Sequence, residues 1–189
     1  MSPRKPANQE LTKDMIIAEA RKQFVERDFN KVSMRSIAKQ LNCSHGSLYY
    51  HFKNKADLFY AIVEEDFHAL NTRLDETIQS DGAPSNKLQN VFIQFIKFGL
   101  DHQSQYELMF MKKNEEVDSL SQEAANLSFQ RFAEAVQTLS DRKLLIKDIY
   151  SAFVALHGFV SHHKGYANSF DEAKEAAHSY VDFILKAIR

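Results

Sequence analysis

Apolar residues recur every three or four positions along residues 12–79, with short polar segments between the runs. This spacing places the apolar side chains on one face of a helix and predicts four helices. Thr12, Ser33 and Ser44 are favoured N-cap residues and mark the starts of the first three, while the fourth begins at Asn54 and runs toward Gln79. The polar segment "LNCS" separates the second and third helices, and Asn42 within it tolerates a left-handed turn conformation.

The same periodicity continues through the rest of the chain. It predicts helices at about 86–102, 104–112, 119–139, 142–163 and 170–188. The segment "SDGAPSN" at 80–86 is the clearest linker, and Ser169 with Glu172 matches a capping box. No β-hairpin signal occurs, so the predicted fold is all-α. We predict an N-terminal helical domain over 10–70, in which two short helices at 33–52 resemble a helix-turn-helix. A connecting helix would join it to a C-terminal helical domain over 71–189.

The amino-acid composition further limits the class of protein. Fifteen Phe against five Gly and three Pro suits a helical protein with a substantial core. No apolar run is long enough to span a bilayer, the N-terminus lacks a signal-peptide pattern, and Cys43 is the single cysteine. These features predict a cytoplasmic protein. No HExxH or GxxxxGK motif is present.

Charge is divided unevenly along the chain. Residues 1–60 carry eleven Lys and Arg against six Asp and Glu, whereas residues 61–189 carry thirteen against nineteen. A basic front on an acidic body favours a polyanionic partner for the front, although chance asymmetry is an open alternative.

The stretch "SHGSLYYHFKNK" at 44–55 is the candidate contact surface. Leu48 and Phe52, four residues apart, can face inward, which leaves the hydroxyl, imidazole and amine groups outward. Such groups bind phosphate oxygens, and Gly46 permits a close backbone approach to a groove. The alternative is an ordinary solvated face, but such a face would favour Lys and Glu over aromatic residues.

The segment "VSMRSIAKQLNCSHGSLYYHFKNKADLF" resembles the DNA-binding domain of the TetR (tetracycline repressor) family of transcriptional regulators. The resemblance rests on the spacing of these residues: Ile37, Ala38, Ser44, Gly46, Leu48, Tyr49, Phe52, Lys55 and Leu58. It implies double-stranded DNA as partner, with phosphate contacts from Ser33, Ser44, Tyr49, Tyr50, His51 and Lys55. His45, Gly46 and Ser47 would approach base edges, although that family often has Lys or Arg where His45 stands.

The C-terminal body resembles a variety of that family with a W-x-x-x-H-G motif. Phe153 replaces the Trp, while His157 and Gly158 are present. The resemblance implies a homodimer around a small-molecule pocket. Candidate lining residues for an apolar ligand are Phe92, Phe95, Phe98, Met109, Phe110, Phe129, Phe132 and His157. These aromatic residues are alternatively plain core.

Apolar stripes on the last two helices suit a helical seam between two subunits. The predicted interface residues are Leu145, Ile149, Phe153, Leu156, Val181, Ile184 and Leu185. A two-fold dimer would match a palindromic operator, whose half-sites lie about 34–36 Å apart or a multiple of that distance. The alternative is that these stripes pack within one subunit.

The sequence predicts no cofactor, no metal site and no catalytic residue. The working hypothesis is a homodimeric repressor released from its operator by a small apolar ligand. Two rivals stay open: a constitutive or architectural DNA binder, and a small helical enzyme using His102 with Asp101, or His157.

Overall fold

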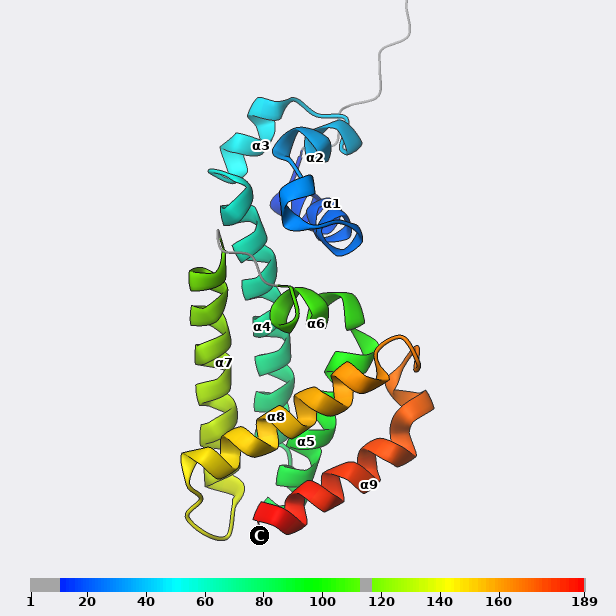
Figure 1. Ribbon diagram of the computed structural model, residues 1–189. Helices are drawn as coiled ribbons and strands as arrows, with labels where there is room; N and C mark the ends of the chain where they lie inside the picture. Colours follow the sequence, from blue (N-terminus) through cyan, green and yellow to red (C-terminus); the bar gives the residue numbers. More distant parts are fainter. Residues whose placement is uncertain (1–10, 113–116, 189) are drawn as a thin grey trace, which may run out of the picture. The chain divides into compact units, whose positions relative to one another are not determined.

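The computed structural model describes residues 11–112 and 117–188. Within these ranges the elements are helical, which confirms the all-α prediction (Figure 1). In chain order they are α1 (Lys13–Glu26), the 3₁₀ turn η1 (Phe29–Lys31), α2 (Met34–Gln40), α3 (His45–His51), α4 (Lys55–Gln79), α5 (Pro84–Asp101), α6 (Gln103–Phe110), α7 (Asp118–Leu139), α8 (Ile146–His163) and α9 (Phe170–Ile188). No helix in these ranges is both long enough and apolar enough to cross a membrane.

The predicted N-caps start the first three helices. The Thr12 hydroxyl accepts a hydrogen bond from the Met15 N–H, and Ser44 accepts one from the Ser47 N–H. Ser33 and Ser36 form a reciprocal capping box at the start of α2. Each cap satisfies backbone donors that the first helical turn leaves unpaired. Asn42, between α2 and α3, has a φ of 52°, so the predicted left-handed turn is confirmed.

Compact packing divides the chain into two units, with the boundary between Ile62 and Val63 inside α4. Unit 1 extends to Ile62 and unit 2 begins at Val63, so α4 contributes residues to both as one continuous helix. The boundary that we predicted at 70/71 lies further along the same helix. The linker at 80–86 lies within unit 2, between α4 and α5.

The core of unit 1 is built around three phenylalanine rings. Phe24 of α1 stacks on Phe29 of η1, with centroids 5.5 Å apart, and both meet the edge of Phe59 of α4. Leu48 and Phe52 are buried as predicted, which holds α3 against the rest of unit 1. The α3 surface that remains outside is therefore set by these two anchors.

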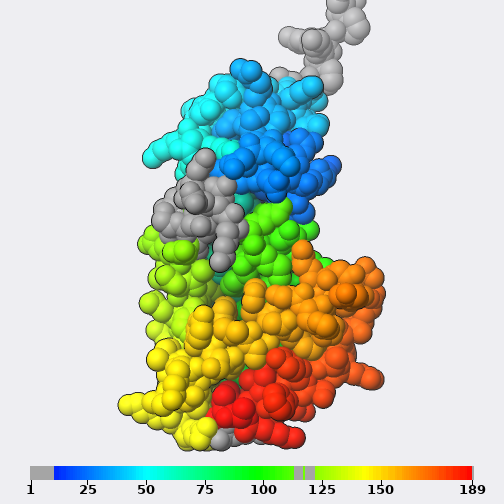
Figure 2. Space-filling model, viewed as in Figure 1, coloured from blue at the N-terminus to red at the C-terminus, as the bar shows by residue number. Residues whose placement is uncertain are grey.

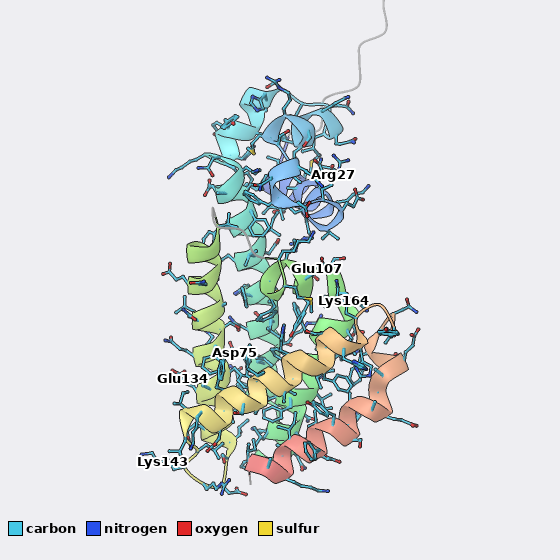
Figure 3. The ribbon with its side chains drawn as sticks, in the orientation of Figure 1. Arg27, Asp75, Glu107, Glu134, Lys143 and Lys164 are labelled. Atoms are coloured by element: carbon cyan, nitrogen blue, oxygen red, sulfur yellow. The ribbon has the colours of Figure 1, made fainter. Side chains whose placement is uncertain are left out.

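In unit 2, α5 is the central helix. It packs against α6, α7, α8 and α9, and nearly all of its apolar residues are buried. Gly99 allows the closest approach, because a Cβ there would lie 2.6 Å from a methyl group of Val160 on α8. A charge pair also ties α6 to the segment after α8, where Glu107 and Lys164 point toward each other at 2.6 Å (Figure 3).

Two local predictions in unit 2 differ from the structure. Helix α8 begins at Ile146, not near 142, because the Leu144 N–H donates to the Gln137 side chain and leaves the preceding residues extended. At the start of α9, Glu172 accepts hydrogen bonds from the backbone and side chain of Asn168, one residue before the predicted partner Ser169.

Most of the predicted dimer-interface residues require correction. Ile149, Leu156, Val181, Ile184 and Leu185 are buried inside unit 2, where α8 and α9 pack on α5 and on each other. Phe153 contacts the rings of an aromatic cluster. Side chains already covered within one chain have no area left to contribute to a second copy. Of the predicted set, Leu145 is exposed.

Candidate nucleic-acid interface

Helix α3 is a short helix with one buried side and a polar outer surface. Its start is held by Ser44, whose hydroxyl lies 3.1 Å from the Ser47 N–H and 2.7 Å from the Ser47 hydroxyl. Leu48 is fully buried, and Phe52 at the C-cap is 4% exposed. The predicted contact residues of α3 therefore lie on a helix whose position is fixed by its cap and its two apolar anchors.

Two tyrosines on α3 are exposed to an extent that packing does not explain. Tyr50 is 88% exposed and Tyr49 is 46% exposed. The Tyr49 ring contacts His45, with centroids 4.8 Å apart, and the Tyr50 ring contacts His51 at 5.2 Å. Large aromatic side chains in solvent lose the free energy that burial would provide, so their exposure points to contact with a partner.

A concave site of about 430 Å³ brings part of the predicted set together. Ser33 from the start of α2, His45 and Tyr49 from α3, and Lys55 from α4 line it. The remaining predicted residues, Ser44, Gly46, Ser47, Tyr50 and His51, are on or at the start of α3 outside this lining.

Arg35 is the residue that sequence reasoning missed. It lines the same concave site and is exposed, two residues after the Ser33 cap. Its signal in the sequence was its position in the first turn of a helix whose N-terminal N–H groups already favour an anion. A guanidinium beside those groups adds a bidentate donor for phosphate.

Lys55 has a structural partner as well as a place in the site. Its ammonium donates to the Phe29 carbonyl oxygen at 2.9 Å and lies 4.0 Å from the centre of the Phe29 ring. The ammonium thus stabilises η1. An ammonium has three N–H donors, and the Phe29 carbonyl takes one of them. The others can reach a phosphate, and the phosphate contact that we predicted for Lys55 stays a prediction.

The segment that contains α2 and α3 carries positively charged side chains and no negatively charged ones. Between Asp28 and Asp57 the chain contains five Lys and Arg residues and no Asp or Glu. Asp57, at the end of this stretch, is engaged by the Lys53 backbone N–H at 2.9 Å. Arg35 and Lys39 lie on α2, Lys53 and Lys55 follow α3, and Lys31 in η1 is paired with Asp28. An excess of cations around a short exposed helix favours a polyanionic partner.

Unit 2 gathers most of the predicted pocket residues into one aromatic cluster. Phe95 contacts the rings of Phe110, Phe132 and Phe153, and Phe92 stacks on Phe132. Phe129 joins the cluster through Phe153, and Met109 is buried on α6. Phe98 is placed differently, against His102 and beneath the Arg73 guanidinium.

One polar pair lies within this aromatic cluster. The Tyr106 hydroxyl is 2.8 Å from Nδ1 of His157. We predicted His157 as a pocket residue from the sequence, but not its contact with Tyr106. Burial raises the pKa of Tyr106 well above 10 and lowers the pKa of His157 below its ordinary 6.5. The Tyr106 hydroxyl therefore stays protonated and forms this hydrogen bond with a neutral His157, whose Nε2 lies 3.4 Å from the Ser161 hydroxyl oxygen.

The fold and site together define a helix-turn-helix protein with a separate helical body. Residues 16–62 match the family model described as bacterial regulatory proteins, tetR family. These residues run from within α1 through α2 and α3 to the first part of α4, so the helix-turn-helix region of unit 1 is similar to that of this family.

Curated relatives match over a similar region. An HTH-type transcriptional regulator of Staphylococcus aureus (strain MRSA252) is 33% identical over 86 residues, which are 45% of this chain and 46% of the relative. A second such regulator, from strain USA300, is 31% identical over 86 residues. The matching region thus spans about half the length of the curated relatives.

Solved structures match over nearly the full chain. The fatty acid degradation regulator FadR from Bacillus halodurans has a TM-score of 0.74 and 16% identity, covering 95% of this chain and 96% of its own. The transcriptional regulator FadR from Bacillus subtilis in complex with stearoyl-CoA has a TM-score of 0.73 and 18% identity, covering 94% and 100%. At these identities the similarity establishes a shared fold.

Proposed function

We propose that this protein is a DNA-binding transcriptional regulator that acts as a homodimeric repressor. The observation that carries the proposal is the outer surface of α3, where exposed Tyr49 and Tyr50 stand in a stretch with five cations and no acid. The tetR-type match of residues 16–62 supports the same function. Phosphate contacts from hydroxyl and cationic groups would position α3, and His45, Gly46 and Ser47 would lie nearest the base edges.

The dimer would use the outward face of α8 and α9. Ile146, Tyr150 and Val154 follow one another at four-residue spacing on α8, and all three are exposed. Leu145 precedes them, and Phe183 on the adjacent helix α9 is 68% exposed. In Figure 2 the atoms of α8 and α9 lie side by side on one face of unit 2. Clustered exposed apolar residues of this kind mark interaction surfaces, and a two-fold interface would supply two α3 helices for a palindromic operator.

The effector would be a small, largely apolar molecule bound at the aromatic cluster of unit 2. Half-buried Phe110, Phe129 and His157 offer an apolar surface with one polar group. The fold is shared with a regulator solved with stearoyl-CoA, which supports a long acyl chain as the ligand class. The W-x-x-x-H-G resemblance around His157 points to the same region.

Contacts within unit 2 supply a route from this cluster to α4. Phe110 meets the ring of Phe67 with centroids 5.2 Å apart, and Gln105 donates to the buried Asp66 at 2.8 Å. An effector that displaced α6 would therefore displace α4, which also carries residues of unit 1. The coupling needs unequal ligand affinity for the two states, typically about 1–3 kcal/mol.

The test is sequencing of genomic fragments that bind the purified full-length protein, followed by release assays. The proposal expects inverted repeats in the bound fragments and loss of binding on addition of stearoyl-CoA, with free coenzyme A as the control. Fragments bound without any shared motif would contradict specific regulation. Specific binding that no acyl-CoA or fatty acid alters would leave the constitutive DNA binder as the function.

A further inference from the structure

We propose that the cleft between α4 and α5 is a second small-molecule site, and that it binds a polar organic acid carrying a single carboxylate. The cleft has a volume of about 820 Å³ and lies entirely within unit 2. This size is within the range of small-molecule sites. The inference goes beyond the proposed function, because it concerns a polar ligand and residues outside the aromatic cluster.

The lining of the cleft follows the helical repeat. Half-buried Ala69, Arg73 and Thr77 recur every four residues along α4 and form its floor. On the α4 rim are the exposed His68, Thr72 and Glu76, and the α5 wall consists of Asn90 and Gln94. The lining is therefore a set of hydroxyl, amide, imidazole and charged groups, with Ala69 as the apolar exception.

Arg73 is a cation held in position at the floor. Its Nη2 lies 3.1 Å from Nε2 of His102, and its guanidinium carbon lies 5.9 Å from the centre of the Phe98 ring. Burial and the neighbouring Arg73 lower the pKa of His102, so the imidazole is neutral at pH 7 and accepts from Arg73. A guanidinium has five N–H donors, and the remaining ones are available to an anion in the cleft.

Two other polar groups of the lining, the Thr77 and Ser80 hydroxyls, donate to backbone carbonyl oxygens of α4, whereas the remaining five have no such partner in the described part of the chain. Among the described residues, the side chains of His68, Thr72, Glu76, Asn90 and Gln94 form no hydrogen bond or ion pair with one another or with Arg73. They present both donors and acceptors above one fixed cation. This combination suits a ligand with hydroxyl or amide groups attached to one acidic group.

Glu76 decides the charge of that ligand. It lies three residues after Arg73, which places the two side chains next to each other on α4. A second negative charge on the ligand would meet the Glu76 carboxylate, so a monocarboxylate is favoured over a phosphate ester. Glu76 can also accept a hydrogen bond from a ligand hydroxyl. A sugar acid has the required groups.

The experiment is a calorimetric titration of the full-length protein with D-gluconate, D-glucose and inorganic phosphate at one fixed ionic strength. We expect saturable binding of gluconate, with glucose at least about tenfold weaker, because loss of a charge-assisted hydrogen bond reduces affinity by about that factor or more. Arg73→Gln should weaken gluconate binding about 10- to 100-fold. Arg131→Gln is the matched control, since Arg131 is exposed and paired with Asp75.

Glu76→Gln gives the second arm, which does not depend on Arg73→Gln remaining folded. Removing the neighbouring negative charge should tighten gluconate binding severalfold and admit phosphate. Three results would overturn the proposal: gluconate binding no tighter than glucose, wild-type protein preferring phosphate, or Glu76→Gln leaving gluconate affinity unchanged. Equal losses in Arg73→Gln and Arg131→Gln, with both variants folded by circular dichroism, would do the same.

Discussion

Gly46 offers a substitution that separates DNA contact from folding. A Cβ at Gly46 would lie 3.8 Å from the Ser44 hydroxyl oxygen, an ordinary van der Waals distance, and its φ does not require glycine. Glycine inside a helix costs about 0.5–1 kcal/mol relative to alanine. We therefore expect Gly46→Ala to leave the free energy of unfolding unchanged or to raise it by up to about 1 kcal/mol.

The same substitution should weaken DNA binding. If α3 approaches the groove as proposed, the added methyl group would occupy space next to the base edges and hold the backbone away from the phosphates. Loss of one hydrogen bond to a charged group is worth about 1.5–3 kcal/mol, so the Kd should rise about tenfold or more. Fluorescence anisotropy with a labelled operator would measure the Kd, and thermal unfolding would measure stability. An unchanged Kd in a stably folded variant would refute the close approach of Gly46.

Gly99→Ala is the contrasting control. Its Cβ would lie 2.6 Å and 2.8 Å from the two Val160 methyl groups and 3.1 Å from Cδ2 of Tyr106. Overpacking of this kind typically costs about 1–3 kcal/mol, so this variant should unfold at a lower temperature. The two variants add the same methyl group with opposite expected effects. Gly46→Ala should lower DNA affinity and keep stability, whereas Gly99→Ala should lower stability at a position outside the proposed DNA contact.

Three further predictions concern stability. Lys55→Met should destabilise unit 1 by about 1–3 kcal/mol in urea unfolding, because the Phe29 carbonyl loses a charged donor; equal stability would assign Lys55 to DNA alone. Tyr106→Phe should cost about 0.5–1.5 kcal/mol by removing the hydroxyl that forms a hydrogen bond with His157, and no change would show that this hydrogen bond contributes nothing. The pKa of His157 lies below 6.5 in the folded state, so its stabilising effect is present above pH 6.5 and is lost as pH falls through the folded value. His157→Gln should flatten that loss in pH-dependent melts, and an identical pH profile would contradict the assignment.

The local features of the fold were predictable because their causes are local. Thr12, Ser33 and Ser44 act as caps through hydrogen bonds to residues three positions away, which the sequence shows directly. The inward pair Leu48 and Phe52 follows from helical periodicity in the same way. The outer face of α3 was predictable as well, because burial of Leu48 and Phe52 determines which side chains of this helix remain exposed.

Partners of buried residues were less predictable. Periodicity shows that Ile149 and Val181 belong to apolar faces, but it does not show whether a face packs on its own chain or on another. The structure places both within unit 2, and the exposed Ile146, Tyr150 and Val154 occupy a different side of α8. Arg73 and His102 lie on separate helices, so their hydrogen bond has no signature in local spacing.

The proposed function requires that the exposed face of α3, together with Arg35 in the first turn of α2, binds the phosphate backbone of duplex DNA. The most direct measurement is the Kd of the full-length protein for duplex DNA at salt concentrations from about 50 to 200 mM. We predict that log K falls linearly with log salt, with a slope of about −0.9 for each phosphate neutralised, and that Arg35→Ala makes the slope shallower by about one unit. Binding that is absent at low salt, or a slope indistinguishable from zero, would contradict it.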